Sequence, residues 1–167
     1  MSHFTVSVHR RYFLLCTTAA VAMSGLPVMM AAETPFVPPD TIEGENGWET
    51  YIDPLMIDRA AASALRPGLD TPEAAVVSFL ASRIRGDRAW RTAMTDDPDR
   101  KGRNALKTWK SWTLNAAQLK ARKMRGPDRG YVSVWMDLMI DGDAESGTDD
   151  FTVQRESDGW RIKSLPS

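Results

Sequence analysis

The chain is almost without cysteine and histidine, two residue types on which much protein chemistry depends. Its 167 residues include one cysteine and two histidines, and all three lie before Thr17. After that point no Ser-His-Asp or Cys-His catalytic arrangement can form. The usual ligands of zinc, haem and iron–sulfur clusters are missing there too, and no disulfide can form. We therefore expect no metal site, no cofactor and a fold held together by packing.

Two further features are missing, a glycine-rich phosphate loop and a strong net charge. The formal net charge is −1, which argues against a general nucleic-acid-binding protein. The charges are nevertheless arranged in blocks, since the segment from Arg83 to Arg129 is rich in bases and its flanks are rich in acids. Either these blocks pair with one another, or the basic block binds an anion.

Residues 1–32 have the organisation of a cleavable signal peptide. A start that ends in Arg10-Arg11 is followed by an apolar stretch to Met30 and by the small pair Ala31-Ala32. The stretch is weak for a transmembrane helix, which needs roughly 20 strongly apolar residues; an uncleaved anchor is the alternative. Arg10-Arg11-Tyr12-Phe13-Leu14 resembles a twin-arginine export signal, and an ordinary secretory signal is the other interpretation. We expect a periplasmic protein.

Residues 33–52 are rich in proline and glycine, which predicts an extended arm and no packed element. Residues 53–167 are long enough for a single domain. A first helix is expected to start at an Asp53 cap and run over Leu55–Leu65. The best-marked helix has Thr71 as its cap, proline at the first helical position and a stop at Gly86.

After the helices, the hydrophobic period changes from helical spacing to alternation. Short helices are expected over Arg88–Met94 and Asn104–Ser111. Strands are expected over Leu114–Arg125, Tyr131–Ile140, Phe151–Glu156 and Trp160–Leu165, with a loop at Asp141–Gly147. Strands joined by short turns are antiparallel. The sequence therefore predicts an α+β fold with N-terminal helices packed on a curved antiparallel sheet.

Several motifs in residues 70–165 carry a family resemblance. Thr71-Pro72-Glu73-Ala74-Ala75, the helix end Arg85-Gly86-Asp87, the following Trp90 and the closing Asp158-Gly159-Trp160-Arg161-Ile162 resemble the nuclear-transport-factor-2-like superfamily. The resemblance implies its cone-shaped, cystatin-like fold. Members include isomerases, hydratases, lipid carriers and subunits that only bind, so the fold by itself leaves the function open.

One carboxylate is a weak catalytic candidate. Asp137 lies between Trp135 and Met139 on one face of a strand, and apolar neighbours could raise its pKa enough to make it a base. In isomerases of the resembling superfamily an aspartate that lines the cone has this role. The face is the more polar one of the strand, however, so a solvent-exposed carboxylate is the favoured interpretation. The acidic loop at Asp141–Gly147 lacks the spacing of a calcium loop.

The aromatic residues suggest two kinds of contact. The candidates for lining a ligand cavity are Trp90, Trp109, Trp112 and Met136, although such residues more often fill a core. Tyr131, Trp135 and Met139 form a second, semi-apolar strand face, which suggests an interface with another chain. The resembling folds often dimerise through that outer face.

Four cations crowd one expected strand: Lys120, Arg122, Lys123 and Arg125. They could guard a sheet edge against aggregation, or they could bind an acidic partner or a lipid headgroup. The function we favour is a non-catalytic exported binding or accessory domain that associates with itself as a homodimer or with a larger exported protein. The alternatives are a periplasmic carrier of a hydrophobic small molecule or lipid, and a small isomerase or dehydratase with a carboxylate base.

Overall fold

Three helices and an antiparallel sheet make up the part of the chain that the structure describes, which confirms the α+β class. The structure is a computed structural model and describes residues 36–98 and 100–166. The strands are β1 (Thr41–Glu43), β2 (Glu49–Tyr51), β3 (Met56–Ile57), β4 (Thr113–Met124), β5 (Arg129–Ile140), β6 (Asp143–Glu156) and β7 (Gly159–Ser164). The helices are α1 (Arg59–Ala64), α2 (Pro72–Arg85) and α3 (Arg100–Trp109), with 3-10 turns η1 (Glu45–Gly47) and η2 (Ala89–Ala93). The expected signal peptide lies outside the described residues.

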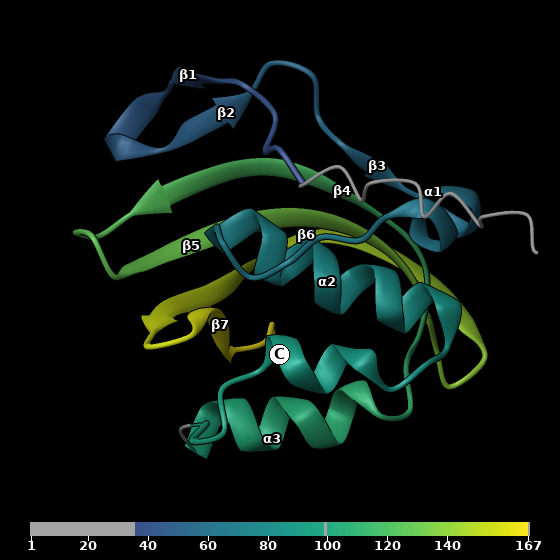
Figure 1. Ribbon diagram of the computed structural model, residues 1–167. Coiled ribbons are helices and arrows are strands. Elements are labelled where there is room, and N and C mark those ends of the chain that lie inside the picture. Colours follow the sequence, from purple (N-terminus) through teal and green to yellow (C-terminus); the bar gives the residue numbers. More distant parts are fainter. Residues whose placement is uncertain (1–35, 99, 167) are drawn as a thin grey trace, which may run out of the picture. The chain divides into compact units, whose positions relative to one another are not determined.

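The strands follow the order β1-β2-β4-β5-β6-β7, and β3 pairs with a separate stretch of β4. Every pairing between these strands is antiparallel. The three long strands β4, β5 and β6 curve around α2 (Figure 1). Alternation of buried and partly exposed residues along β5 agrees with the predicted period of two.

Helix α2 forms where the sequence predicts it because both of its ends are capped. The Thr71 hydroxyl accepts a hydrogen bond from the Ala74 N–H at 3.0 Å, and Pro72 occupies the first position. The helix ends at Gly86, whose φ of 78° lies in the left-handed region. Between these ends the helix is buried on nearly every side and packs on β4, β5, β6 and β7.

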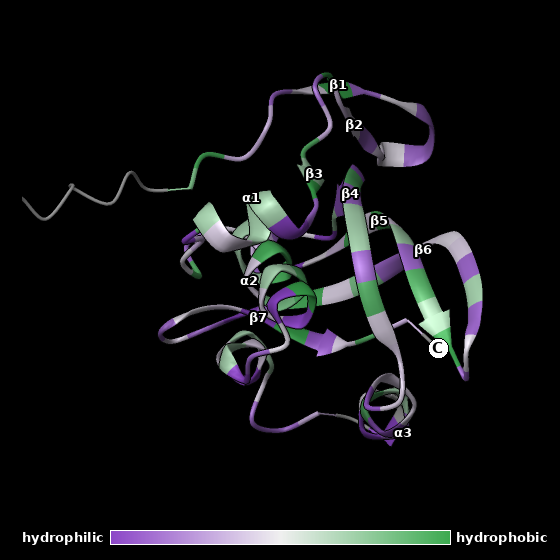
Figure 2. Ribbon diagram, turned by 90° about the vertical axis from the view of Figure 1, so that its right-hand side faces the viewer, coloured by the Kyte–Doolittle hydropathy of each residue, from purple (hydrophilic) through white to green (hydrophobic). Residues whose placement is uncertain are grey.

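The sheet has two different faces, which we call inner and outer. The inner face carries Val132, Val134, Met136 and Leu138 of β5 and is buried against the helices. The outer face carries Tyr131, Ser133, Trp135, Asp137 and Met139, which are half-buried. Helices α1 and α2 lie on one side of strands β4–β6 (Figure 2). Among the described residues, no helix packs on the outer face of β5.

The expected arm before residue 53 is partly wrong. Strands β1 and β2 form a hairpin that pairs with the end of β4, and the Tyr51 side chain is only 2% exposed. The expected helix over Leu55–Leu65 is wrong in its first third, since Met56 and Ile57 form β3. Asp58 caps the helix in place of Asp53, accepting a hydrogen bond from the Ala61 N–H at 2.8 Å.

The expected loop at Asp141–Gly147 is also wrong. The chain turns at Asp141 and Gly142, with φ angles of 52° and 98°, and β6 begins at once. Residues 143–150 are exposed on both sides and are held as a strand by their pairing with β5. Helix α3 begins at Arg100, earlier than the expected start at Asn104.

Candidate binding surface

Two of the four cavity candidates, Trp90 and Trp109, fill the core. Their ring centroids lie 6.0 and 5.3 Å from that of Phe79. Trp109 is 2% exposed, and its Nε1 donates a hydrogen bond to the Pro166 carbonyl at 2.9 Å. The space that remains beside these rings is about 10 Å³, which is barely the room of one water molecule. The expected ligand cavity between helices and sheet is not present at this point.

The other two cavity candidates, Trp112 and Met136, line a shallow groove at the open end of the inner face. Leu138 and Ile140 continue its apolar floor, and β6 forms one side. The groove has a volume of about 160 Å³, whereas pockets for small ligands usually hold roughly 300–1,000 Å³. The structure therefore separates the four candidates into a filled core and an open surface groove.

The weak catalytic candidate Asp137 lies on the outer face, as its polar neighbours indicated. It pairs with Ala116 of β4 and Ser146 of β6. The helices are on the opposite side of the sheet, so Asp137 does not point into the space that a cone-lining base would occupy. No group of His, Cys, Asp or Glu that could hold a metal ion occurs among the described residues.

A buried carboxylate that no local sequence signal marks as a site residue lies at the start of α2. Glu73 is fully buried, and its Oε1 accepts hydrogen bonds from Tyr51 Oη at 3.1 Å and from Arg122 Nη1 at 3.0 Å. Its Oε2 has no hydrogen-bond partner in the described part of the chain. Arg122 also donates to Glu49 Oε2, through Nη2 at 2.7 Å and Nε at 2.9 Å. We call Tyr51, Glu73, Arg122 and Glu49 the hairpin network.

Charge and burial shift the pKa values of two members of the network. Hydrogen bonds from Arg122 and from the Thr41 hydroxyl lower the pKa of Glu49. Burial, and then the neighbouring Glu73 carboxylate, raise the pKa of the Tyr51 phenol far above its usual value. Tyr51 therefore stays a neutral donor, and the network ties the β1–β2 hairpin to α2 and β4.

The expected basic patch is dispersed in the structure. A register shift between Leu119 and Ala121 reverses the alternation of β4, so Arg122 points inward to Glu73. Lys123 points outward and donates to the Asn46 carbonyl.

The interpretation of β4 as an edge strand is wrong as well, because β2 and β3 pair with the edge of β4 that faces away from β5. On the outer face Lys120 donates to Gln118 Oε1 at 2.9 Å. Arg125 lies apart from these residues and lines a pocket.

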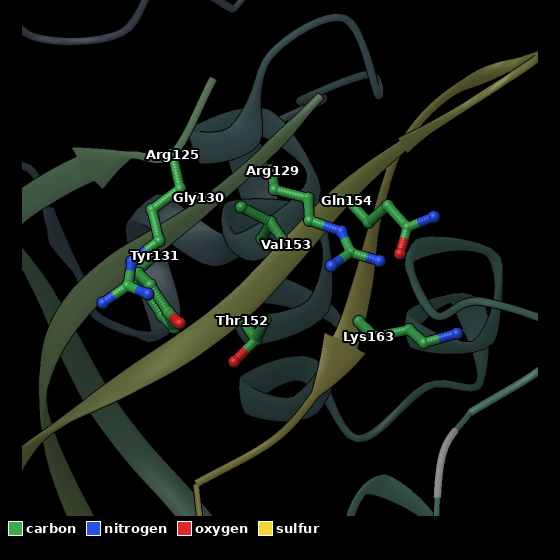
Figure 3. A pocket seen from close by; sticks show the side chains of 8 residues that line it. All are labelled: Arg125, Arg129, Gly130, Tyr131, Thr152, Val153, Gln154 and Lys163. Carbon is green, nitrogen blue, oxygen red and sulfur yellow. The ribbon is translucent and has the colours of Figure 1, made fainter. Parts of the chain in front are cut away.

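This pocket lies at the β4–β5 hairpin end of the outer face (Figure 3). Its volume is about 260 Å³, and its lining is Arg125, Arg129, Gly130, Tyr131, Thr152, Val153, Gln154 and Lys163. The guanidinium carbon of Arg125 lies 5.2 Å from the Tyr131 ring centroid. Of the predicted interface residues, Tyr131 borders this pocket, while Trp135 and Met139 continue the same row along β5.

Comparisons with known proteins add no constraint on the function. No family model, no curated protein and no solved structure matches this chain. Within the described ranges, no helix has the length and apolar character needed to cross a membrane. The described residues show a filled interior, an outer face that none of their helices covers and a cationic pocket at one end of that face.

Proposed function

We propose that this chain is an exported, non-catalytic binding domain that docks through the outer face of its sheet, and that the occupant is a second copy. One observation carries the proposal. Tyr131, Trp135 and Met139 form a semi-apolar row on a face that no described helix covers, although the inner face already supplies the core. Aromatic residues and methionine are enriched where proteins meet one another.

The row is complementary to itself, which favours a second copy as the occupant. Consider two copies face to face, related by a twofold axis that passes Trp135 and runs across the strands. Tyr131, four positions before Trp135, then lies opposite Met139, four positions after it. A methionine sulfur beside an aromatic ring is a favourable contact. A twofold interface requires this kind of reciprocal pairing, because the same patch serves both subunits.

The polar residues between the row members fit the same arrangement. Ser133 and Asp137 lie two positions before and after Trp135, so each would oppose the other across the axis. A hydroxyl can donate a hydrogen bond to a carboxylate, and no two carboxylates of β5 would face one another. Asp137 then has a role as an interface acceptor, and the proposal assigns it no role as a base.

The wider architecture supports a binding role. An antiparallel sheet with helices on one face agrees with the resemblance to the nuclear-transport-factor-2-like superfamily, and we propose that the chain belongs to it. The filled interior at Trp90 and Trp109 offers no room for a carrier's cargo. Because histidine and cysteine are confined to the first 16 residues, catalysis would depend on carboxylate, tyrosine or lysine groups alone.

The test is the mass of the assembly formed by protein recovered after export, measured by sedimentation and by native mass spectrometry. We expect a dimer for the wild type and a folded monomer for the double change Tyr131→Ser with Trp135→Ser. The matched control is Val37→Ser, which removes an apolar side chain that is 77% exposed in the segment before β1 and should leave the dimer intact.

Two results would overturn this proposal. A wild-type monomer at all concentrations, or a double variant that remains dimeric, would remove the outer face as the docking surface. A native mass that contains a different exported protein in place of the second copy would keep the face and correct the occupant.

A further inference from the structure

The pocket at the β4–β5 hairpin end gathers positive charge without an acid. Three of its lining residues are cations, Arg125, Arg129 and Lys163, and none is a carboxylate. The remaining polar members, Tyr131, Thr152 and Gln154, all carry a group that can donate a hydrogen bond. Arg125 lies beside Tyr131, whereas Arg129 and Lys163 extend with Gln154 toward the other side of the pocket (Figure 3). Cations that share one concave site lower the energy of an anion bound beside them. The lining therefore has the chemistry of an anion site.

These cations lack the partners that other cations of the domain have. Arg122 bonds to Glu49 and Glu73, and Arg161 bonds to Asp158. Arg129, in contrast, makes no side-chain hydrogen bond or ion pair with the described residues. Among those residues Arg125 has only the ring of Tyr131 as a side-chain contact of this kind.

Lys163 is only partly engaged. Its ammonium donates to the Asp97 carbonyl at 2.9 Å, and a carbonyl is a neutral acceptor. An ammonium has three N–H donors, so its full charge and two of its donors stay available. None of the three cations of the pocket therefore forms an ion pair with a described carboxylate.

The backbone fixes the positions from which these side chains extend. The Arg125 N–H donates to the Arg129 carbonyl at 2.8 Å, which closes the β4–β5 hairpin. In the β5–β6 ladder Arg129 lies opposite Gln154, and Tyr131 lies opposite Thr152. Side chains directly opposite each other on one sheet face are neighbours. The polar groups are thus held on adjacent strands, and ordering them costs little backbone entropy.

We propose that this pocket binds a phosphate group carried by a small molecule or by a lipid headgroup. The proposal goes beyond the docking function and does not rest on it. Guanidinium forks and hydroxyl or amide donors suit the tetrahedral, doubly charged phosphate. Arg129 and Lys163 compensate its charge, and Thr152 and Gln154 donate to its oxygens. A volume of about 260 Å³ leaves room for an attached organic group beside Tyr131.

The primary experiment is calorimetric titration at low salt with inorganic phosphate and with glycerol 3-phosphate. We expect saturable binding to the wild type and roughly tenfold weaker binding to Arg129→Gln, as the loss of one charge-assisted hydrogen bond predicts. The matched control is Arg88→Gln. Arg88 is also exposed and makes no side-chain bond within the described residues, but it lies outside the pocket, so its replacement should leave the affinity unchanged.

Flotation with vesicles identifies the source of the phosphate. Binding to phosphatidylcholine vesicles that contain phosphatidic acid, but not to pure phosphatidylcholine, indicates a headgroup. Binding to glycerol 3-phosphate without association with either vesicle indicates a soluble ligand. In both cases Arg129→Gln must weaken the interaction and Arg88→Gln must not.

The proposal is overturned by the absence of saturable binding to both soluble probes and to both vesicle types, or by equal losses in Arg129→Gln and Arg88→Gln. The second result would mean that only the general charge of the protein attracts the anion. Saturable binding by a wild type that stays monomeric keeps the pocket even where the docking proposal fails. A wild-type dimer that binds no phosphate supports the docking proposal and overturns the phosphate proposal.

Discussion

Removal of Arg122 is the most informative perturbation of this fold. In the change Arg122→Met, the fully buried Glu73 loses the cation that lies 3.0 Å from its Oε1. The Tyr51 hydroxyl then remains as its single hydrogen-bond donor among the described residues. A buried charge left without its partner destabilises a protein by about 3–5 kcal/mol. Methionine retains much of the volume of the arginine stem, so packing changes contribute little to this cost.

The expected loss is large relative to the whole stability of a domain, which is commonly about 5–15 kcal/mol. For a domain of this size, each kcal/mol corresponds to about 3 °C in melting temperature. Arg122→Met should therefore lower the Tm by about 10–15 °C. Thermal and urea denaturation followed by circular dichroism measure both quantities.

Two further variants separate the buried charge from the rest of the hairpin network. Glu49→Gln breaks the pair of Arg122 with a carboxylate that is 34% exposed, so it should cost at most about 1 kcal/mol. Adding Glu73→Gln to Arg122→Met removes the stranded charge and should recover a clear part of the lost stability. The reasoning is refuted where Arg122→Met costs less than Glu49→Gln, or where the added Glu73→Gln lowers stability further.

Two predictions concern pH and a turn. The pKa of Glu49 is lowered below its ordinary value of 4.5. Its contribution to stability is therefore complete above that value and is lost as the pH falls through the folded pKa. Urea unfolding at a series of acid pH values should show this loss of unfolding free energy in the wild type, and a smaller loss in Arg122→Met. At Gly159, with φ of 132°, an added Cβ would lie 2.7 Å from the Leu69 carbonyl oxygen, so Gly159→Ala should cost more than about 1 kcal/mol. The same change at Gly147, where a Cβ meets nothing within 4 Å, should be nearly neutral, and a Gly159→Ala variant as stable as Gly147→Ala would contradict the steric argument.

The elements that could be predicted are those whose signal lies within the element. Helix α2 has its cap at Thr71, a proline at the first helical position and its stop at Gly86, so its bounds are local information. Strand β5 alternates because one face lies in the core and the other does not, and this pattern is visible in the sequence.

The elements that were missed obtain their structure from distant partners. Residues 143–150 of β6 are exposed on both sides and show no apolar alternation, yet each pairs with a residue of β5. The β1–β2 hairpin is short, and it is stabilised by its contact with β4 and by the burial of Tyr51. Tertiary pairing of this kind overrides local composition.

The hairpin network and the cationic pocket also bring together residues from distant parts of the sequence, so local patterns could not predict them. Glu73 at the first turn of a helix agrees with the helix dipole, and nothing local indicates that Tyr51 and Arg122 converge on it. The register shift in β4 moved Arg122 to the inner face, which a strict alternation of sides could not predict. Arg129 was not singled out, although its position in a hairpin beside Arg125 was the available signal.

The charges along the free edge of β6 favour the proposed docking through the outer face over the competing pairing of sheet edges. Strand β7 pairs only with residues 152–156 of β6, so within the described chain no strand pairs with residues 143–151 on that side. An open edge invites pairing with another copy. Asp143, Glu145, Asp149 and Asp150 lie along it, all of them exposed, and two such edges brought together would repel each other. The outer face has no comparable row of like charges beside Trp135, so the charge pattern disfavours the edge and leaves the face available to a second copy.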